Sequence, residues 1–224
     1  IGCSKPKPGE QAVKKIIAST GNKHVSKMVL NLADFKTVKK FAGDFCSKED
    51  RLNILVNNAG IAGFHLKEGR TLTKDNNEMV VQTNHLGHFL LTNLLKKPLT
   101  EAGSARVVNV SSVAHMWAED LTDINSDKAY HSRGCYQKSK RFNILFSNAL
   151  ARRWKSFGVS SFSLHPGLVT TEIFNLMPAW ASNFIVPLSY LIGRSTYQGA
   201  QTTLHCCLEP GLEEHSGTYW SDCT

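Results

Sequence analysis

The sequence predicts an α/β fold in which a doubly wound parallel sheet is covered by helices on both faces. Short β-rich runs alternate with stretches of helical periodicity, which is typical of strands joined by crossover helices. Several predicted strands end in Gly, Asn or Ser turns, as in sheets that carry a site at their carboxyl edge. The 224 residues contain no repeat, low-complexity tract or linker, so we expect one domain over residues 1–224.

The first half of the chain supplies two predicted strands and three predicted helices. In chain order they are a helix over 10–20, a strand over 25–30, a helix over 34–46, a strand over 53–56 and a long helix over 75–96. Gly21 and Asn22 end the first helix, and Asp34 is a good N-cap for the second. Pro98 closes the long helix, which contains Asn84 in its middle.

The second half continues the alternation. In chain order it predicts a strand over 106–110, a helix over 135–154, a strand over 159–164, a helix over 196–208 and a short strand over 218–220. Residues 115–134 are polar and irregular, whereas residues 173–192 are apolar and interrupted by Pro178 and Pro187. The order of elements is that of a Rossmann-like sheet.

Composition excludes several classes of protein. Hydrophobic residues make up 42% and charged residues 20%, as in soluble globular proteins, and no signal peptide or charge-free run of 18 apolar residues occurs. The net charge is +8, and residues 1–50 hold ten lysines against five acids. These lysines are scattered without interleaved aromatic residues, which favours a solvated face over a nucleic-acid site.

The cysteines indicate a reducing compartment. The chain has six, and no two of them have C-x-x-C spacing. A disulfide framework is not expected in a chain of this length, so we predict an intracellular protein on the cytosolic side. The sequon at Asn109 falls in a predicted buried strand, which argues against glycosylation.

Tyr136 and Lys140 are candidates for proton transfer. Residues four apart share one helix face, so the phenol and the ammonium are presented together. A free phenol has a pKa of about 10, and a nearby cation lowers it toward the range where the phenol can act as acid or base. A Tyr-x-x-x-Lys pair alone occurs by chance on many helices, so its neighbours decide its meaning.

Four further groups of residues support a shared site: three follow predicted strands, and the fourth is a single Asn within a predicted helix. Ser111-Ser112 ends one predicted strand, where a hydroxyl can donate to a substrate oxygen, and Asn57-Asn58-Ala59-Gly60 ends the strand before it. Residues 166–171 (PGLVTT) form a similar ledge of mostly small residues after the strand that follows the tyrosine helix. Asn84 is intrinsically unfavourable within a helix and needs a reason to be there. Four such groups in chain order predict one site at the sheet edge.

With these motifs the sequence resembles the short-chain dehydrogenases/reductases, and within them the retinol dehydrogenase subgroup. The segments that carry the resemblance are NNAG at 57–60, TNHLGHFLLTNLL at 83–95, RVVNVSS at 106–112, YQKSK at 136–140 and HPGLVTTEI at 165–173. The similarity covers essentially the whole chain. It implies an NAD(P)-dependent oxidoreductase acting on a lipophilic alcohol or aldehyde such as retinol or retinal.

The resemblance also implies a role for individual residues. Tyr136 would be the general acid/base, Lys140 would lower its pKa and hold the nicotinamide ribose, and Ser112 rather than Ser111 would polarise the substrate carbonyl. Asn84 would anchor a water that links Lys140 to solvent. The cofactor-binding positions implied in addition are Asn31 at the adenine, Asn58, Ala59 and Gly60 at the adenosine ribose, and Val169 and Thr171 at the nicotinamide carboxamide.

Two departures from the family pattern weaken cofactor binding. The glycine-rich turn T-G-x-x-x-G-x-G is absent, since no two of the sixteen glycines are spaced i, i+2 or i, i+4. The segment Ile1–Ser4 resembles the end of the family's second strand, so the first strand and helix are expected to be missing, and the C-terminus also ends early. Ser4 stands where the subgroup has Arg, which weakens the implied preference for NADP over NAD.

Three functions therefore stay open. The first is the dehydrogenase, with NADP as cofactor and NAD as the alternative, a lipophilic substrate, a homodimer formed by the two long helices, and peripheral contact with the endoplasmic reticulum membrane in the full-length protein. The second is a catalytically silent fragment or isoform that cannot bind dinucleotide. The third is a basic surface-binding module, which rests on the net charge alone. No metal site is expected, because His85 and His88 lack a third ligand nearby in sequence.

Overall fold

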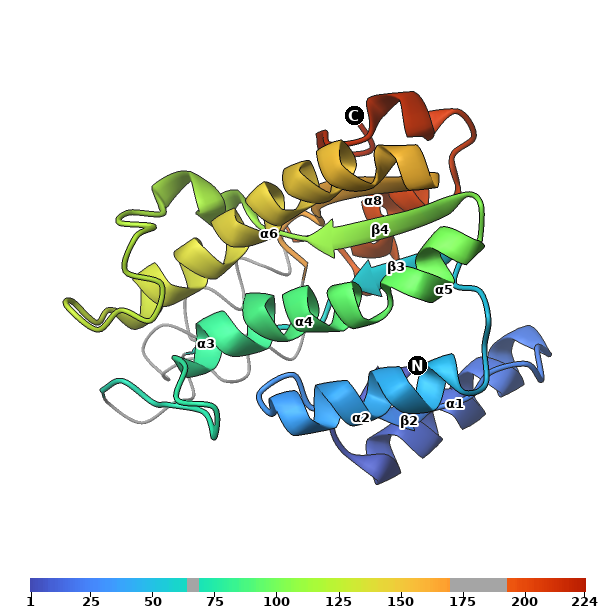
Figure 1. Cartoon of the computed structure of the whole chain (residues 1–224), viewed down its shortest axis with the longest axis horizontal. Coiled ribbons are helices and arrows are strands. Elements are labelled where there is room, and N and C mark those ends of the chain that lie inside the picture. The colour runs from blue at the N-terminus through green and yellow to red at the C-terminus, as the bar shows by residue number, and fades with distance from the viewer. Residues whose placement is uncertain (64–68, 170–192) are drawn as a thin grey trace.

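The computed structural model of the chain describes residues 1–63, 69–169 and 193–224 (Figure 1). The elements of the first half are β1 (Gly2–Cys3), α1 (Pro6–Thr20), β2 (Met28–Val29), α2 (Phe35–Cys46), β3 (Ile54–Asn57), α3 (Met79–Val81), the π-turn η1 (Gln82–Leu86), α4 (Gly87–Leu94) and α5 (Lys96–Glu101). Those of the second half are β4 (Ala105–Val110), the 3₁₀ turn η2 (Val113–Trp117), α6 (Ser132–Trp154), the 3₁₀ turn η3 (Lys155–Phe157), β5 (Val159–His165), α8 (Thr196–Leu208), the 3₁₀ turn η5 (Leu212–His215) and β6 (Tyr219–Ser221).

All the described strands pair in parallel, as the alternation of strands and helices predicts. β3, β4, β5 and β6 form one sheet in that order, and β1 pairs with β2 in a second sheet. Within the described residues no ladder joins β1 to β3, so each of these strands has an open edge. Figure 1 shows the β1–β2 unit with α1 and α2 on one side of the larger sheet, next to α4.

The larger sheet is buried on both faces because alternate residues of a strand point in opposite directions. On one face Val107 packs in a core with Leu91 of α4 and Leu150 of α6. On the other face Val108 packs with Cys206 and Cys207 of α8. The first core also includes Val38 and Ala42 of α2, so it ties the β1–β2 unit to the larger sheet. Helices on both faces confirm the doubly wound architecture.

The long helix predicted over 75–96 begins later than predicted and is divided at Leu95. Glu78 is the N-cap of α3, with its carboxylate accepting from the Val81 amide, so residues 75–78 lie outside the helix. Leu95, with φ −90° and ψ 12°, separates α4 from α5. Pro98 consequently lies in the first turn of α5, where a missing amide is tolerated, and does not close the helix as predicted.

The strand predicted over 25–30 is reduced to Met28–Val29, and most other boundaries lie within three residues of those predicted. Asp34 caps α2 by accepting a hydrogen bond from the Lys36 amide. The first helix begins earlier than predicted, because Pro6 supplies the fixed φ of a first helical position. All six cysteines are free, as predicted, and Asn109 is buried within β4.

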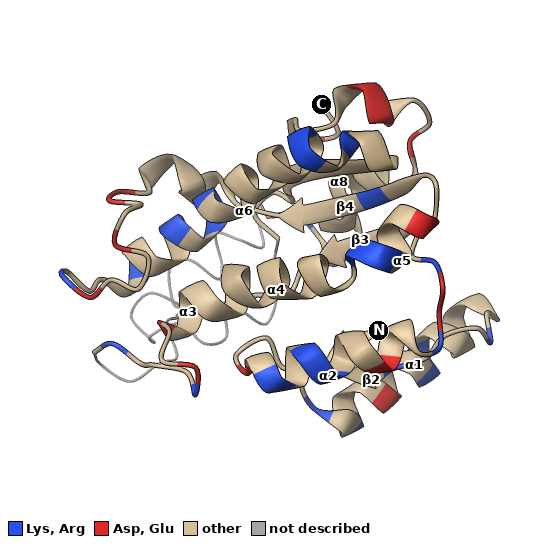
Figure 2. Cartoon of the chain, viewed as in Figure 1, with Lys and Arg blue, Asp and Glu red and all other residues tan. Residues whose placement is uncertain are grey.

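The basic residues are spread over several elements. Figure 2 shows Lys and Arg on α1, α2, α5 and α6, with acidic residues among them. Lys27 pairs with Glu10, and Lys40 pairs with Asp44 one turn along α2. Among the described helices, none is long and apolar enough to cross a membrane.

Candidate active site at the sheet edge

Tyr136 and Lys140 lie one turn apart on α6, at the carboxyl end of β4. Lys140 is 5% exposed, and its Nζ donates to the Val110 carbonyl at 3.1 Å. The same Nζ lies 5.6 Å from the centre of the Tyr136 ring. The helix thus presents phenol and ammonium on one face, as their spacing predicts, and leaves two Lys140 N–H groups without a partner among the described residues.

The two serines after β4 have different surroundings. Ser111 is buried, and its hydroxyl donates to the Lys140 carbonyl at 2.7 Å, which fixes α6 against the strand end. Ser112 caps η2 by accepting from the Ala114 amide, and its hydroxyl lies near enough to the Tyr136 phenol to lower the pKa of that phenol. Of the two hydroxyls, that of Ser112 therefore faces the phenol.

Asn84 joins three parts of the site. It is fully buried in the π-turn η1, where the Gly87 amide donates to the Gln82 carbonyl five residues back. Its Oδ1 accepts from the Ile61 amide at 2.8 Å. Its Nδ2 donates to the Ile61 carbonyl at 2.9 Å and to Ser139 Oγ at 3.0 Å. The side chain is thus occupied in clamping the loop after β3 to α6.

Two histidines are buried behind this clamp. His88 Nδ1 lies 3.0 Å from the Asn84 carbonyl oxygen, and His85 Nδ1 lies 3.1 Å from Asn143 Oδ1. Burial lowers the pKa of each imidazole to about 4. Both rings are therefore neutral at pH 7 and act as structural hydrogen-bonding groups.

Burial also sets the pKa values of the two candidate catalytic groups. It raises the pKa of Tyr136 above its ordinary value, and the hydrogen bond from Ser112 offsets only part of the rise. It lowers the pKa of Lys140 to about 8. The helical spacing predicts a lowered pKa for Tyr136, whereas in the structure burial of the phenol raises it.

A cavity of about 850 Å³ opens beside these groups, and we call it the sheet-edge cavity. Its lining includes Tyr136, Lys140, Ser112, Asn58, Ala59, Gly60 and Val169, together with residues of α8. A side chain at Gly60 would meet Asn84 Oδ1 at 3.0 Å and Lys140 Nζ at 3.7 Å, so the glycine leaves this space open. A buried ammonium with two free donors beside small residues fits the ribose end of a nicotinamide dinucleotide.

Two predicted cofactor residues do not join this group. The side chain of Asn31 accepts from the Ala33 amide at the start of α2, and Asn31 does not line the sheet-edge cavity. Thr171 and the apolar stretch 173–192 lie outside the described residues. The structure therefore brings Asn84, Ser112, Tyr136, Lys140 and the 58–60 turn together, and Val169 also lines the sheet-edge cavity.

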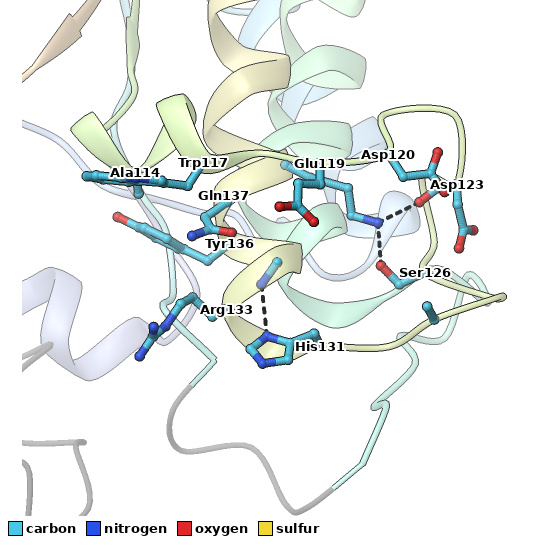
Figure 3. Close-up of a pocket in the computed structure, with 13 residues that line it drawn as sticks. Ala114, Trp117, Glu119, Asp120, Asp123, Ser126, His131, Arg133, Tyr136 and Gln137 are labelled. Carbon is cyan, nitrogen blue, oxygen red and sulfur yellow. Dashed lines mark hydrogen bonds between the residues drawn. The ribbon is translucent and has the colours of Figure 1, made fainter.

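A second cavity, of about 800 Å³, also has Tyr136 in its lining, and we call it the η2 cavity (Figure 3). Tyr136 lines both cavities. The η2 cavity is bounded by Ala114 and Trp117 of η2, by the start of α6, and by the loop over 119–131. Sequence reasoning missed it, because residues 115–134 show no periodicity. The signal available in the sequence is Trp117, a large aromatic residue five residues beyond Ser112.

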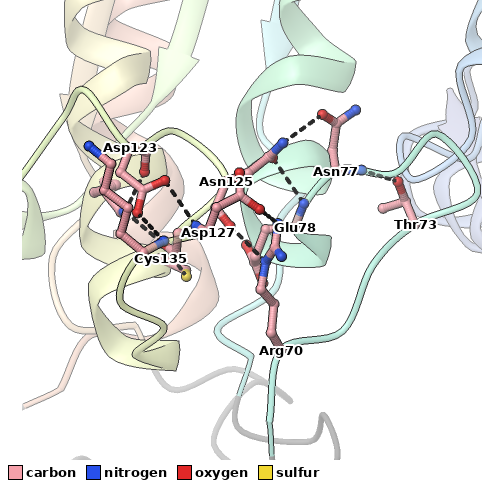
Figure 4. A network of polar contacts seen from close by, with 11 residues as sticks. Arg70, Thr73, Asn77, Glu78, Asp123, Asn125, Asp127 and Cys135 are labelled. Atoms are coloured by element: carbon pink, nitrogen blue, oxygen red, sulfur yellow. Dashed lines mark hydrogen bonds and ion pairs between the residues drawn. The ribbon is translucent and has the colours of Figure 1, made fainter.

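A network of polar contacts holds the loop of the η2 cavity in place (Figure 4). Arg70 pairs with Asp127 and donates to the Asn125 carbonyl at 2.9 Å. The Asn125 side chain accepts from the Glu78 amide at the start of α3. Lys138 of α6 donates to the Asp123 carbonyl at 2.7 Å. The loop is thus fixed to both helices that carry the site.

A doubly wound fold with a Ser, Tyr and Lys at the carboxyl edge of the sheet defines an oxidoreductase of the dehydrogenase type. The chain belongs to the short-chain dehydrogenase family, whose model matches residues 3–181. It is 39% identical to human retinol dehydrogenase 11 and 41% identical to bovine retinol dehydrogenase 12, in each case over 100% of this chain and 69% of the relative.

Solved structures agree on the fold. The NADPH-bound carbonyl reductase from chicken fatty liver matches 99% of this chain and 83% of its own, with a TM-score of 0.66 and 21% identity. Levodione reductase matches 97% of this chain and 83% of its own, with a TM-score of 0.75 and 17% identity. The family match and the two relatives confirm the resemblance to the family and to its retinol dehydrogenases.

Proposed function

We propose that the chain transfers a hydride between a nicotinamide dinucleotide and a lipophilic alcohol or aldehyde such as retinol or retinal. The observation that carries the proposal is the convergence of Ser112, Tyr136 and Lys140 at a sheet-edge cavity that has a ledge of small residues. The similarity to proteins named retinol dehydrogenases supports the substrate class.

Each side chain has a chemical task in this proposal. The dinucleotide, when bound, donates or accepts the hydride. Tyr136 is protonated at neutral pH, since a phenol has an ordinary pKa of about 10 and burial raises it further, and its hydroxyl is the proton donor to the oxygen of a carbonyl under reduction. The Ser112 hydroxyl hydrogen-bonds the same oxygen, and the two free N–H groups of Lys140 bind the ribose hydroxyls.

NADP is the proposed cofactor, and NAD is the alternative. Ser4 and Lys5 follow β1, where the phosphate of an NADP adenosine would be bound. Lys5 supplies a single cationic group there. Kd values for NADPH and NADH, measured by nicotinamide fluorescence for the wild-type protein and Lys5→Ala, decide between the two. A loss confined to NADPH supports NADP, and unchanged binding of both contradicts it.

The proton-transfer role is tested by the substitution Tyr136→Phe in the protein. The ring stays and the proton is lost, so kcat for retinal reduction should fall about 10²–10⁴-fold, the usual contribution of general acid–base catalysis. Tyr197→Phe is the control, since Tyr197 is 76% exposed on α8. Full activity of Tyr136→Phe would overturn the assignment.

The proposal also includes association of two copies of the chain and contact with a membrane. The outer surfaces of α4 and α6 expose Phe89, Leu94 and Leu145, which suits pairing of two copies through these helices. Leu145→Glu should then shift the sedimentation of a dimer to that of a monomer. Peripheral binding to an endoplasmic reticulum membrane is tested separately, by flotation with phosphatidylcholine vesicles. Absence from the vesicle fraction would contradict it.

A catalytically silent form is the second candidate, and one observation favours it. β1 and β3 have open edges that face no strand among the described residues, and the sixteen glycines include no pair with the spacing of a pyrophosphate-binding turn. Calorimetric titration of residues 1–224 with NADPH and NADH separates the candidates. Micromolar binding by a folded sample would exclude the silent form.

A further inference from the structure

The η2 cavity meets the sheet-edge cavity at Tyr136, and its opposite wall is aromatic. Figure 3 shows the indole of Trp117 above the phenol of Tyr136, on the side of the cavity formed by η2. Tyr136 lines both cavities, so with the dinucleotide in the sheet-edge cavity the η2 cavity is the space we assign to the part of the substrate beyond its carbonyl. Trp117 is then the largest apolar surface beside those atoms.

Trp117 is an unusual residue to leave in water. It is 57% exposed, and its indole N–H has no hydrogen-bond partner among the described residues. A tryptophan buries a large area when a ligand covers it, and its flat face prefers another π-system. The short turn that carries Trp117 begins at Ser112, which caps it through the Ala114 amide. The indole is therefore positioned by the same turn that positions the candidate catalytic hydroxyl.

The remaining wall supports a flat ligand. Ala114, Ala129 and Gly134 line the cavity with small side chains, so a rigid planar group can lie against the indole without a clash. The charged side chains of Glu119, Asp120 and Arg133 line it as well. The aromatic face adjoins Tyr136, and the polar network of Figure 4 holds the loop over 119–131, one side of this wall, against α6.

We propose that Trp117 determines substrate specificity by stacking on a conjugated system next to the reacting carbonyl. The inference rests on the proposed function and narrows its substrate class from lipophilic aldehydes to conjugated ones, such as polyenals and aryl enals. Stacking binds ground state and transition state alike, so it acts on KM rather than on kcat. An aromatic contact of this kind corresponds to about a 10-fold change in affinity.

The test compares a conjugated aldehyde, all-trans-retinal, with a saturated aldehyde of similar length. Trp117→Ala should raise KM for retinal about 10-fold, with kcat unchanged and little effect on the saturated aldehyde. Trp117→Phe should recover most of the loss. Met116→Ala is the matched control, because Met116 is 63% exposed on the same turn and does not line the cavity.

The outcomes separate this inference from the proposed function. If the wild-type protein reduces no aldehyde in a Tyr136-dependent way, the proposed function fails. If it does so, and Trp117→Ala changes KM for retinal and for the saturated aldehyde equally or changes neither KM, the proposed function stands. Stacking on Trp117 is then wrong. A fall in kcat with both substrates would show that the variant has displaced Ser112 and would also contradict a pure specificity role.

Discussion

Lys140 shows how one buried side chain can set the pH range of a reaction. Its pKa of about 8 comes from desolvation, so the ammonium is present below pH 8 and absent above it. A neutral amine attracts the ribose hydroxyls less strongly and gives less electrostatic support to a phenolate. The role proposed for Lys140 therefore ties activity to the protonation of this one group.

We expect kcat/KM for aldehyde reduction to fall as the pH rises above about 8, because kcat/KM reports groups of the free enzyme. Lys140→Arg should remove this limb of the profile, since a guanidinium stays charged to above pH 12. Steady-state rates between pH 6 and 10 measure both. An unchanged limb in Lys140→Arg would assign the titration to another residue.

Loss of folded protein would not explain the fall of kcat/KM above pH 8. The lysine pKa is about 10.5 in the unfolded chain and about 8 in the folded one. Between these values the unfolded state binds more protons. The cost of burying the charged lysine therefore falls, and the fold becomes more stable, as the pH rises. A melting temperature that holds steady or increases from pH 8 to 9, while activity falls, separates catalysis from stability.

Among the elements, α4 depends on a glycine for its position. Gly87 begins α4, and a Cβ there would lie 2.6 Å from the Leu32 carbonyl oxygen and 2.8 Å from Leu32 Cβ. Leu32 is buried in the core that ties α2 to α4. The close approach of these two elements therefore requires the absence of a side chain at this position.

Gly87→Ala should destabilise the protein by about 1–3 kcal/mol, because backbone atoms must move apart. Gly43→Ala is the matched control, since a Cβ at Gly43 in α2 meets no atom within 4 Å. That exchange should stabilise by about 0.5–1 kcal/mol, the usual difference between Gly and Ala within a helix. Urea unfolding measures both, and equal midpoints would contradict the steric account.

Local chemistry explains which elements could be predicted from the sequence. Asp34 and Pro6 act within one turn of chain, so caps and starts follow from neighbouring residues. The break at Leu95 and the π-turn at 82–86 are not local: they depend on where α4 meets Leu32 and where Asn84 reaches Ile61 and Ser139. A sequence pattern holds no information on those tertiary contacts.

The same distinction applies to the site. The spacing of Tyr136 and Lys140 predicts their shared face, because a helix fixes it. Their pKa values depend also on burial, which spacing does not give: the spacing predicts a lowered pKa for Tyr136, and burial raises it. The η2 cavity is formed in part by an irregular loop and its polar contacts, so no periodic pattern of the sequence predicts it.

Over the whole molecule, the open edges of β1 and β3 govern solution behaviour. Val29, Ile54 and Val56 are 48%, 37% and 40% exposed beside these edges. Unpaired backbone groups next to apolar side chains are a template for pairing with another chain. Sequence reasoning predicted apolar exposure around residues 53–56, and the structure confirms it.

We expect residues 1–224, prepared alone, to associate with increasing concentration through these edges. Ile54→Lys should raise the monomer fraction, because edge lysines oppose strand pairing. Val108→Lys is the comparison, since Val108 is fully buried in the central strand β4 and its replacement should unfold the sheet. Light scattering over a dilution series decides, and a monodisperse wild-type monomer would contradict the expectation.

The π-turn at Gln82–Leu86 has a consequence for comparing this chain with its relatives. It inserts one residue into an otherwise α-helical run, so the parts before and after it differ in angular phase by about 100°, the rotation that one helical residue contributes. Removing a residue there would leave an ordinary helix of good stability while turning Asn84 away from Ile61 and Ser139. A one-residue gap in an alignment at this point would therefore mark a chain in which the residue at the place of Asn84 faces another direction and cannot make these contacts.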